Sequence, residues 1–539
     1  MDYNYGSSFT LGMAVLAALA VAAALLQRML KIEKDPREPP FIPEGVPYIG
    51  HLIGMVQQGA KYYQGITDRL ALPIYTLRTI NSRTYVVNSP ELAAAVQRNS
   101  KTLTFNPIAL AVSSRMSQFD KATVTTLRVN MNSEEGNWGV FPETHDMMYA
   151  ILAPGPDLED MNARVLTQLA SVINALSPRQ DGEDMKLWAW LRHTFTCCSS
   201  HAVYGPENPF ATNPELEPAF WDFEAGLITL LVNVFPSITA TKAYYGREAV
   251  LAALREYVEK ERYRTASKLI QERIGLNARY GFSKKMQAHA ELAMLFGSLV
   301  NAAPTCFWLL VQIFSRPWLL AEVRGEVMHC VSQESDGIAI VRTINVKRLV
   351  RECPMFNSTY REVLRFTASI ASSRLALADT VISSAKGDSY LLKKGSVIQI
   401  QGGVIHADAS VWGEDVKEFN PRRFLASPSA HPSAVSAGAD EKHQTAAPEP
   451  KKLHPAAFRA FGGGSTLCPG RHFAQVEILS FVALFVAGFD VTAVDGALVV
   501  APEKEETRIP LGIQKPLTDI DVRVKRRQGF EEVVWRFVN

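Results

Sequence analysis

The stretch Phe461-Gly462-Gly463-Gly464-Ser465-Thr466-Leu467-Cys468-Pro469-Gly470-Arg471 decides the fold. Three glycines precede one cysteine, and a Pro-Gly turn leads from it into a predicted helix that begins at Arg471. Glycine lets a backbone approach a flat ligand closely, and amide groups at a helix start favour the thiolate form of a nearby cysteine. A lone thiolate on such a loop suits an axial ligand of haem iron. An ordinary buried cysteine in a glycine-rich turn is the alternative.

The loop resembles the cysteine-ligand loop of the cytochrome P450 family, whose pattern here is F-G-x-G-x-x-x-C-P-G. The resemblance implies a haem-thiolate monooxygenase that binds haem b through Cys468, with Phe461, Gly464 and Gly470 shaping the loop around the cofactor. It also implies the family's fold, which is mainly α-helical with small β-sheets.

Two segments upstream strengthen the resemblance. Glu362 and Arg365 form an E-x-x-R pair on one helix face, although a surface ion pair is the usual interpretation of that spacing. Arg423 lies in a segment that resembles the family's F-x-P-x-R-F pattern. The resemblance implies that the three side chains form a buried charge network that holds the cysteine loop, with Arg422 as the alternative partner.

Other positions depart from the family's usual pattern. Thr466 stands where most members carry a basic residue that contacts a haem propionate, and the resemblance suggests that Arg374 takes part of this role. A solvated strand residue is the alternative for Arg374. The family's W-x-x-x-R segment is not found before Glu159. His406 is expected to serve in a turn or a cap, since no second histidine or cysteine stands near it at metal-ligand spacing.

The predicted central helix through residues 291–308 departs from the pattern as well. Ala303 and Pro304 take the places of the acid and alcohol found in most members, and Thr305 follows. The N-x-x-P-x-x-F-W pattern resembles the branch that contains cholesterol 7α-hydroxylase and prostacyclin synthase. Proline removes one helical hydrogen bond and kinks the helix. Because the acid-alcohol pair is missing, Asn301 and Thr305 are the candidate catalytic residues for ordering the water that delivers protons. A reaction that does not need this step is the alternative.

The substrate is expected to be an apolar small molecule, such as a terpenoid, steroid or polyketide, in specialised or lipid metabolism. The candidate pocket residues lie on the central helix, where core packing is the equally simple alternative: Phe296, Leu299, Val300 and Ala303. The resemblance implies O₂ and NADPH-cytochrome P450 reductase as partners, with cytochrome b5 as a further donor. Arg459, Arg471 and the nearby Lys451-Lys452 pair are candidates for docking an acidic partner, with solvation and contact with a haem propionate as the alternatives. A haem-thiolate isomerase or dehydratase and a non-catalytic haem-binding protein are the rival classes.

Bulk composition fits an enzyme of this kind. The chain has 539 residues, with 56 Lys and Arg against 54 Asp and Glu, so the net charge is +2. This balance gives no basic excess to suggest nucleic-acid binding. The six cysteines contain no C-x-x-C pair and are sparse for the length, which indicates a reducing compartment.

The N-terminus carries a location signal. Residues 9–27 are apolar and long enough to span a bilayer, and basic residues follow them. The positive flank favours an uncleaved transmembrane helix with residues 1–8 in the lumen and the catalytic part facing the cytosol from the endoplasmic reticulum. A cleaved signal peptide is the alternative.

The rest of the chain is expected to form one large unit. Residues 28–50 form a basic, proline-rich linker and residues 51–539 the haem-binding domain. Within that domain, paired strands are predicted over 73–90. Helices are predicted over 145–175, 215–275 and 285–366, and further strands over 388–404 and 485–513. Residues 426–452 are expected to be a disordered surface insertion.

Overall fold

The computed structural model describes residues 13, 32–46, 49–80, 82–177, 181–232, 234–335, 340–385, 387–425, 453–509 and 511–538. The predicted transmembrane segment (apart from residue 13) and the predicted insertion lie outside these residues. The motif order favours one large unit, but by their contacts the residues divide into two compact units. Unit 1 comprises residues 1–104, 372–401 and 507–509, and unit 2 comprises the remainder.

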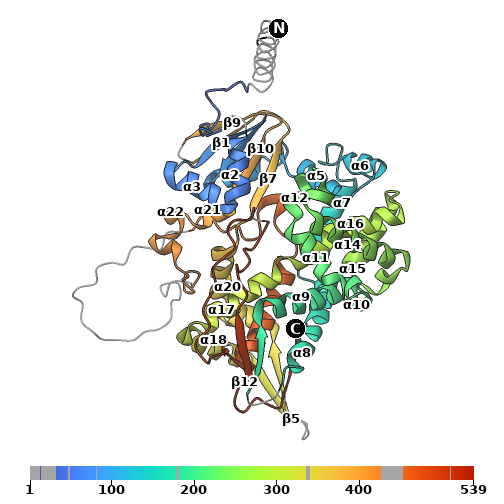
Figure 1. Ribbon diagram of the computed structural model, residues 1–539, viewed down its shortest axis with the longest axis vertical. Coiled ribbons are helices and arrows are strands. Elements are labelled where there is room, and N and C mark those ends of the chain that lie inside the picture. Colours follow the sequence, from blue (N-terminus) through green and yellow to red (C-terminus); the bar gives the residue numbers. More distant parts are fainter. Residues whose placement is uncertain are drawn as a thin grey trace, which may run out of the picture. The chain divides into compact units, whose positions relative to one another are not determined.

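Unit 1 is built on a five-stranded sheet with the order β1-β2-β10-β7-β3. Figure 1 labels β1, β10 and β7 of this sheet. The alternating pattern at residues 73–90 forms the antiparallel pair of β1 and β2, as predicted. β10 joins β2 in parallel, and β8 pairs with β9 in a separate hairpin. The elements of unit 1 are α2 (Gly50–Gln58), α3 (Ala60–Leu70), β1 (Ile74–Thr79), β2 (Ser82–Val87), α4 (Pro90–Arg98), β3 (Leu103–Thr104), β7 (Ala371–Ala376, whose first residue belongs to unit 2), β8 (Thr380–Ser383), β9 (Ser389–Leu392) and β10 (Val397–Gln401).

The middle of the predicted linker packs against this sheet. The buried Glu38 carboxylate accepts hydrogen bonds from Arg83 at 2.5 Å and from the Tyr85 hydroxyl at 2.6 Å. Phe41 forms a β-bridge with Thr76, and the backbone N–H of Ile42 donates to the Thr76 carbonyl. This part of the linker is therefore fixed within unit 1.

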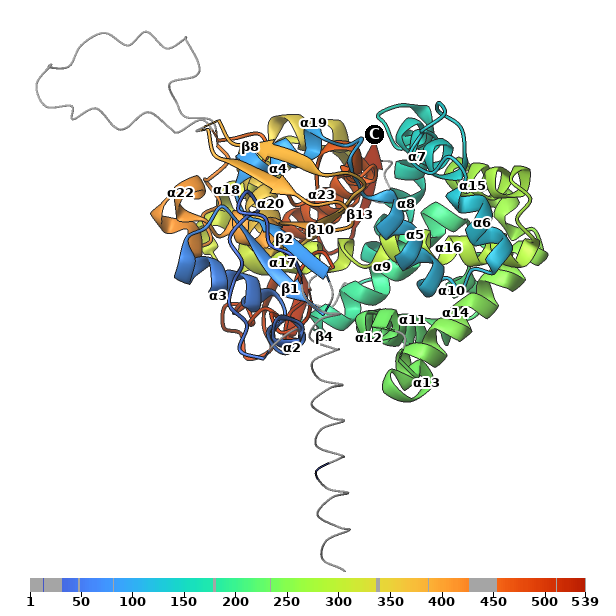
Figure 2. The ribbon, with the colours of Figure 1, turned by 90° about the horizontal axis from the view of Figure 1, so that it is seen from above.

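Unit 2 is mainly helical. Its elements up to the end of α15 are α5 (Asn106–Met116), α6 (Lys121–Arg128), α7 (Val140–Ile151), α8 (Pro156–Asn174), β4 (Glu183–Lys186), α9 (Leu187–Tyr204), α10 (Pro209–Thr212), α11 (Leu216–Ala225), α12 (Leu227–Val232), α13 (Pro236–Thr239), α14 (Thr241–Glu259), η1 (Arg262–Thr265) and α15 (Lys268–Arg279). Figure 2 shows α11, α14 and α16 side by side in this unit.

The remaining elements of unit 2 carry the residues singled out by the sequence. They are α16 (Lys284–Leu299), α17 (Ala302–Phe314), α18 (Pro317–His329), β5 (Val331–Ser335), β6 (Ile340–Asn345), α19 (Val346–Glu352), α20 (Pro354–Thr367), α21 (Gly402–His406), α22 (Ala409–Trp412), η2 (Glu414–Lys417), η4 (Gly464–Thr466), α23 (Arg471–Gly488), β11 (Phe489–Ala493), β12 (Asp521–Arg526) and β13 (Val533–Val538).

Two apolar helices form the centre of unit 2. Every residue of α17 is buried, and so is α23 from Glu477 to Gly488. A helix that is hydrophobic on all sides is buried in a core or spans a membrane. Among the described residues, Lys284–Phe314 and Arg471–Gly488 are long and apolar enough to span a bilayer, yet 72% of each apolar window is buried inside the protein. Both stretches, the first of which covers α16 and α17, therefore belong to the core of this unit.

Several short strands differ from the expectations. Residues 285–366 are not helical throughout, because β5 and β6 form an antiparallel pair within them and β13 joins β6 in parallel. Residues 485–488 complete α23, so the strand β11 starts at Phe489. β11 pairs with β12, which in turn pairs with β4. These partners are far apart in sequence, and such pairing leaves little local signal.

Candidate active site

The Cys468 loop is closed by its own backbone. The N–H of Cys468 donates to the Phe461 carbonyl at 2.8 Å, and the N–H of Leu467 donates to the Gly464 carbonyl at 3.1 Å. Gly464 has a φ of 62°, a left-handed conformation that glycine adopts without strain. The helix α23 begins at Arg471, as predicted, and the Arg471 side chain donates to the Cys468 carbonyl at 3.0 Å. The loop thus presents one half-buried sulfur at a helix start.

Two opposing effects act on the Cys468 thiol. Burial raises its pKa, while the backbone amide of Gly470 and the charge and amide of Arg471 act in the opposite direction. The backbone amides at the start of α23 are present, as the sequence indicates. Without a bound metal, however, burial raises the pKa of Cys468 more than these amides lower it. Because a metal binds the thiolate, ligation to iron would release the thiol proton.

The structure brings Glu362, Arg365 and Arg423 together. Glu362 is fully buried, and Arg365 donates to both of its carboxylate oxygens at 2.7 Å. Arg423 donates from Nε to the same two oxygens at 3.1 Å. Arg422 instead pairs with Glu322 at the surface. The pair in E-x-x-R is therefore an interior pair, and Arg423 is the third member.

Asp415 is a fourth member that the sequence reasoning missed. Its carboxylate accepts a hydrogen bond from Arg423 Nη1 at 2.9 Å, which holds the pKa of Asp415 below its usual value. The two arginines are thereby balanced by two carboxylates. Asp415 lies only eight residues before Arg423, a proximity that was visible in the sequence.

His406 connects this network to the segment that begins the cysteine loop. Its Nε2 accepts from the backbone N–H of Arg459 at 2.8 Å, while Nδ1 donates to the Ala368 carbonyl at 3.2 Å. Burial lowers the pKa of His406 to about 3, so the ring is neutral. Its own carbonyl accepts from Arg365 at 2.8 Å. The residue therefore bridges three segments of chain.

Arg459 is buried, with 1% of its surface exposed. The prediction that it docks an acidic partner is therefore wrong, because a partner protein cannot reach this side chain. The backbone of Arg459 instead helps to hold the cysteine loop, because its carbonyl accepts a hydrogen bond from the N–H of Gly462 at 2.9 Å.

Two residues of α7 reach the cysteine loop. The Tyr149 hydroxyl donates to the Leu467 carbonyl, next to Cys468, and His145 Nε2 lies 3.2 Å from the Ser465 carbonyl. Their rings stack with centroids 4.3 Å apart. The sequence lacks the W-x-x-x-R segment, but this H-x-x-x-Y pair has the same four-residue spacing, and that was the available signal.

The predicted kink in the central helix is a break between two helices. α16 ends at Leu299 and α17 begins at Ala302, with Pro304 as the third residue of α17. Proline cannot donate to the Val300 carbonyl, which loses its regular helical partner there. The Thr305 hydroxyl donates to the Asn301 carbonyl at 2.7 Å.

The Asn301 side chain has a structural partner. Its Oδ1 accepts from the backbone N–H of Ile513 at 3.0 Å. A Cβ at Gly512 would lie 2.1 Å from the same oxygen, so only glycine fits this approach. Asn301 therefore ties the helix break to the chain at residues 512–513.

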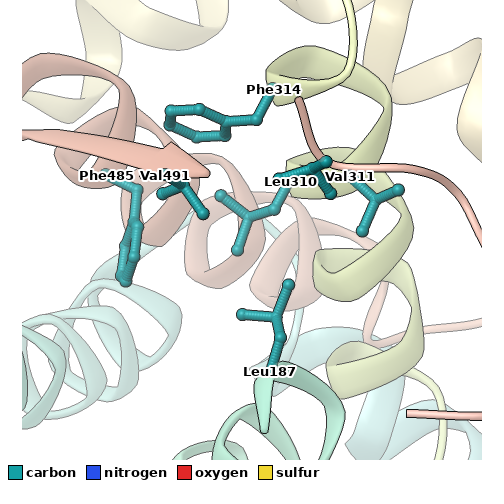
Figure 3. A pocket seen from close by; sticks show the side chains of 7 residues that line it. Leu187, Leu310, Val311, Phe314, Phe485 and Val491 are labelled. Atoms are coloured by element: carbon teal, nitrogen blue, oxygen red, sulfur yellow. The ribbon is translucent and has the colours of Figure 1, made fainter. Parts of the chain in front are cut away.

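The predicted pocket residues lie around the same break. Leu299, Val300 and Ala303 are buried, and the Phe296 ring packs edge-on against Phe223 with centroids 6.0 Å apart. None of the four lines the apolar void in Figure 3, which lies farther along α17 and is a packing gap in the core. That void is lined by Leu187, Leu310, Val311, Phe314, Phe485, Val491 and Val499.

Arg374 lies on β7 in unit 1. It is buried, which lowers its pKa to about 10, and Nη1 donates to the Ser373 carbonyl at 2.8 Å. A solvated strand residue is therefore the wrong interpretation. Its contact with a haem propionate stays a prediction.

Comparisons with known proteins agree with this loop and fold. The family model described as Cytochrome P450 matches residues 238–517. Cytochrome P450 monooxygenase nodJ of Hypoxylon pulicicidum is 30% identical over 526 residues, covering 97% of this chain and 96% of that protein. This chain belongs to the cytochrome P450 family. Its relatives are named monooxygenases, and it is an enzyme of that class.

More distant comparisons support the branch and the fold. Cholesterol 7-alpha-monooxygenase of Cricetulus griseus is 28% identical over 307 residues, covering 54% of this chain and 57% of that enzyme. The solved structure of retinoic acid bound cyanobacterial CYP120A1 matches with a TM-score of 0.67 at 17% identity, covering 92% of this chain and all of that one. The mainly helical P450 fold with small sheets is thus confirmed.

The residues present fit the haem-thiolate group that the P450 family implies. A single sulfur lies on a loop whose backbone is hydrogen-bonded on both sides of Cys468, which helps to hold the donor in position. Amides at the start of α23 act in favour of the thiolate. The donor set is one soft, anionic ligand, as a thiolate-bound haem requires.

Proposed function

We propose that this cytochrome P450 is a membrane-anchored monooxygenase that oxygenates an apolar small molecule such as a terpenoid, steroid or polyketide. The observation that carries the proposal is the Cys468 loop, which is braced by its own backbone, by α7 and, through His406, by the buried network around Glu362. A loop braced in this way suits a metal ligand that must keep its position. The steroid option draws on the likeness to cholesterol 7-alpha-monooxygenase.

In this proposal Cys468 supplies the thiolate to haem b, and Phe461, Gly464 and Gly470 set the path of the loop. A bound haem supplies the oxygen chemistry, while the protein supplies binding, orientation and electrostatics. Glu362, Arg365 and Arg423 act structurally, because an interior ion pair holds its segments only when every partner is present.

The proposed proton delivery uses the break between α16 and α17. The Thr305 hydroxyl donates to the Asn301 carbonyl, so its oxygen still has lone pairs to accept from a water. The Asn301 Oδ1 is engaged by Ile513, which leaves the amide Nδ2 as the donor toward that water. The apolar side chains of Phe296, Leu299, Val300 and Ala303 form the proposed substrate pocket beside it.

We also propose where the protein is located in the cell. Residues 9–27 anchor the chain in the endoplasmic reticulum membrane with residues 1–8 in the lumen, and residues 28–50 connect the anchor to the cytosolic domain 51–539. NADPH-cytochrome P450 reductase supplies electrons, and Arg471 is the remaining described candidate for its docking.

The test is turnover with labelled oxygen. Extracts of a host with and without this chain identify the compound that disappears, and the purified enzyme then receives that compound with reductase, NADPH and ¹⁸O₂. We expect a product that carries one labelled oxygen atom and requires all three additions. Product formed without NADPH, reductase and O₂ would instead establish the isomerase class.

A further inference from the structure

Three metal-ligating side chains meet on unit 2, at the contact of α9 with α11. His193 and Cys197 lie one turn apart on α9 and therefore share one face of that helix. Glu217 comes from the first turn of α11. One ligand atom from each residue lies within 4.8 Å of the other two. None of the three belongs to the proposed haem or substrate site.

The distances between these atoms are close to those of a bound ion. His193 Nδ1 lies 2.7 Å from Glu217 Oε2, and Cys197 Sγ lies 3.9 Å from both ring nitrogens of His193. Zinc binds such ligands at about 2.0–2.3 Å in a tetrahedron, which places ligand atoms about 3.3–3.7 Å apart. The His193–Glu217 separation must therefore widen, and the Cys197–His193 separation must close, each by under about 1 Å. The Cys197 sulfur lies within 4.8 Å of the Glu217 oxygen, and this pair must also reach about 3.3–3.7 Å to complete three corners of that geometry.

We propose that His193, Cys197 and Glu217 form a binding site for a zinc-class divalent cation, with water as the fourth ligand. One sulfur, one imidazole nitrogen and one carboxylate oxygen suit zinc, whereas magnesium and calcium require oxygen ligands. Burial together with the Glu217 charge raises the pKa of the Cys197 thiol to about 11. Because zinc binds the thiolate form of cysteine, the Cys197 thiol proton is released to solvent when the ion binds.

The surrounding contacts hold the two helices in place. One turn beyond Glu217, the indole N–H of Trp221 donates to the Thr196 hydroxyl at 3.3 Å. The neighbouring cation Arg192 lies over the Trp221 ring, 5.4 Å from its centroid. The His193 side chain is 64% exposed and that of Glu217 is 16% exposed, so an ion reaches the site directly from solvent.

An ion at this site links α9 to a helix that packs on the proposed pocket. α11 also carries Phe223, whose ring contacts Phe296 on α16. Occupancy therefore fixes α11 against α9 without touching the cysteine loop. Sequence spacing alone does not reveal the site, because Glu217 lies on a different helix, 20 residues after Cys197.

The test uses the full-length, haem-loaded protein without a histidine tag. After treatment with a chelator, the protein is dialysed against zinc chloride, and zinc and iron are measured together by mass spectrometry. We expect one zinc per iron. Absorption at the zinc K-edge, which is separate from that of iron, should show one sulfur at about 2.3 Å and nitrogen or oxygen neighbours at about 2.0–2.2 Å.

Variants identify the ligands. Loss of a supporting partner alone lowers metal affinity about 10–100-fold, so Cys197→Ser and Glu217→Gln should each lower zinc affinity by at least about tenfold. His201→Ala, one turn beyond Cys197 on the same helix, is the matched control and should bind zinc as the wild type does. Undiminished zinc binding by Cys197→Ser, at normal iron content, would overturn the proposal. A zinc spectrum without sulfur would do so independently of any variant.

Discussion

Glu362 is the residue on which two interior guanidinium groups depend. Arg365 is paired with Glu362 alone among the described carboxylates, whereas Arg423 also has Asp415. Removal of Glu362 therefore leaves Arg365 without a paired carboxylate, whereas Arg423 keeps Asp415. An unpaired interior charge costs far more than the net value of the ion pair itself.

Glu362→Ala should accordingly destabilise the protein by about 3–5 kcal/mol. The expected signs are poor accumulation of haem-loaded protein and a lower unfolding midpoint, with substrate choice unchanged in the fraction that folds. Arg422→Ala, in which an exposed ion pair is lost next to Arg423, is the control and should cost no more than about 1 kcal/mol. Normal haem content in Glu362→Ala would show that the network does not hold the loop.

His406 should make the protein sensitive to acid. In the unfolded chain its pKa is near 6.5, while burial lowers it to about 3 in the folded protein. Between these values the unfolded state binds one more proton, so stability is full above pH 6.5 and falls as the pH drops toward 3. The slope from this one group is about 1.4 kcal/mol per pH unit.

Urea unfolding at pH 4.5 and pH 7 measures this effect. His406→Gln, which cannot gain the proton, should show a smaller difference between the two pH values than the wild type. The exposed His329→Gln should leave the difference unchanged. An identical pH dependence in His406→Gln and wild type would contradict the buried, neutral histidine.

At the scale of elements, Asn301 at the break between α16 and α17 has two proposed roles, a structural contact with Ile513 and the ordering of water. Substitutions of Asn301 distinguish these roles. Asn301→Ala leaves the Ile513 N–H without its acceptor, at a cost of about 1–3 kcal/mol. Asn301→Asp keeps an acceptor oxygen in reach. We therefore expect a lower unfolding midpoint for the alanine variant alone.

Asn301→Ala also tests proton delivery during turnover. If Asn301 orders water, Asn301→Ala should form less product and more peroxide for each NADPH consumed. Peroxide release equal to that of the wild type would limit Asn301 to its structural contact with Ile513.

The elements also show which signals a sequence carries. Residues 73–90 were predictable as paired strands because they alternate and pair with their immediate neighbours. The start of α23 at Arg471 follows from the Pro-Gly turn before it. β5 and β6 were missed because their mixture of polar and apolar residues is similar to that of the helices on either side. β4 was missed because its partner strand β12 lies more than 300 residues away in the sequence.

The site divides in the same way. The cysteine loop and the arginines of the network follow motifs of fixed spacing, so their residues were identifiable from the sequence. The bridging role of His406 and the contact of Tyr149 with the loop depend on tertiary contacts with backbone groups. Backbone partners leave no residue pattern. The sequence also gives no sign that the Arg459 side chain is buried, which is why docking to a partner was predicted for it.

At the scale of the whole molecule, the proposed anchor is independent of the haem motifs. Deletion of residues 1–34 should release the protein from membranes, or leave weak peripheral attachment, while its haem spectrum stays intact. Glu38 binds Arg83 and Tyr85 and lies beyond the deletion, so the fold of unit 1 is preserved. Membrane fractionation followed by carbonate extraction measures the effect.

A full-length variant provides the matched control for that deletion. Leu16→Arg combined with Leu19→Arg keeps the length but makes insertion unfavourable by about 2.5–3.5 kcal/mol per arginine. It should also leave the membrane fraction. A mature wild-type protein whose N-terminus begins after residue 26 would show a cleaved signal in place of an anchor.

The central claim is that Cys468 supplies a thiolate to haem iron. The most direct measurement is the absorption spectrum of the reduced, carbon monoxide-bound protein, because a thiolate ligand shifts the Soret band strongly to the red. The wild type and Cys197→Ser should both show the shifted band, whereas Cys468→Ser should lose it. A Cys468→Ser protein that kept the shifted band would contradict the account.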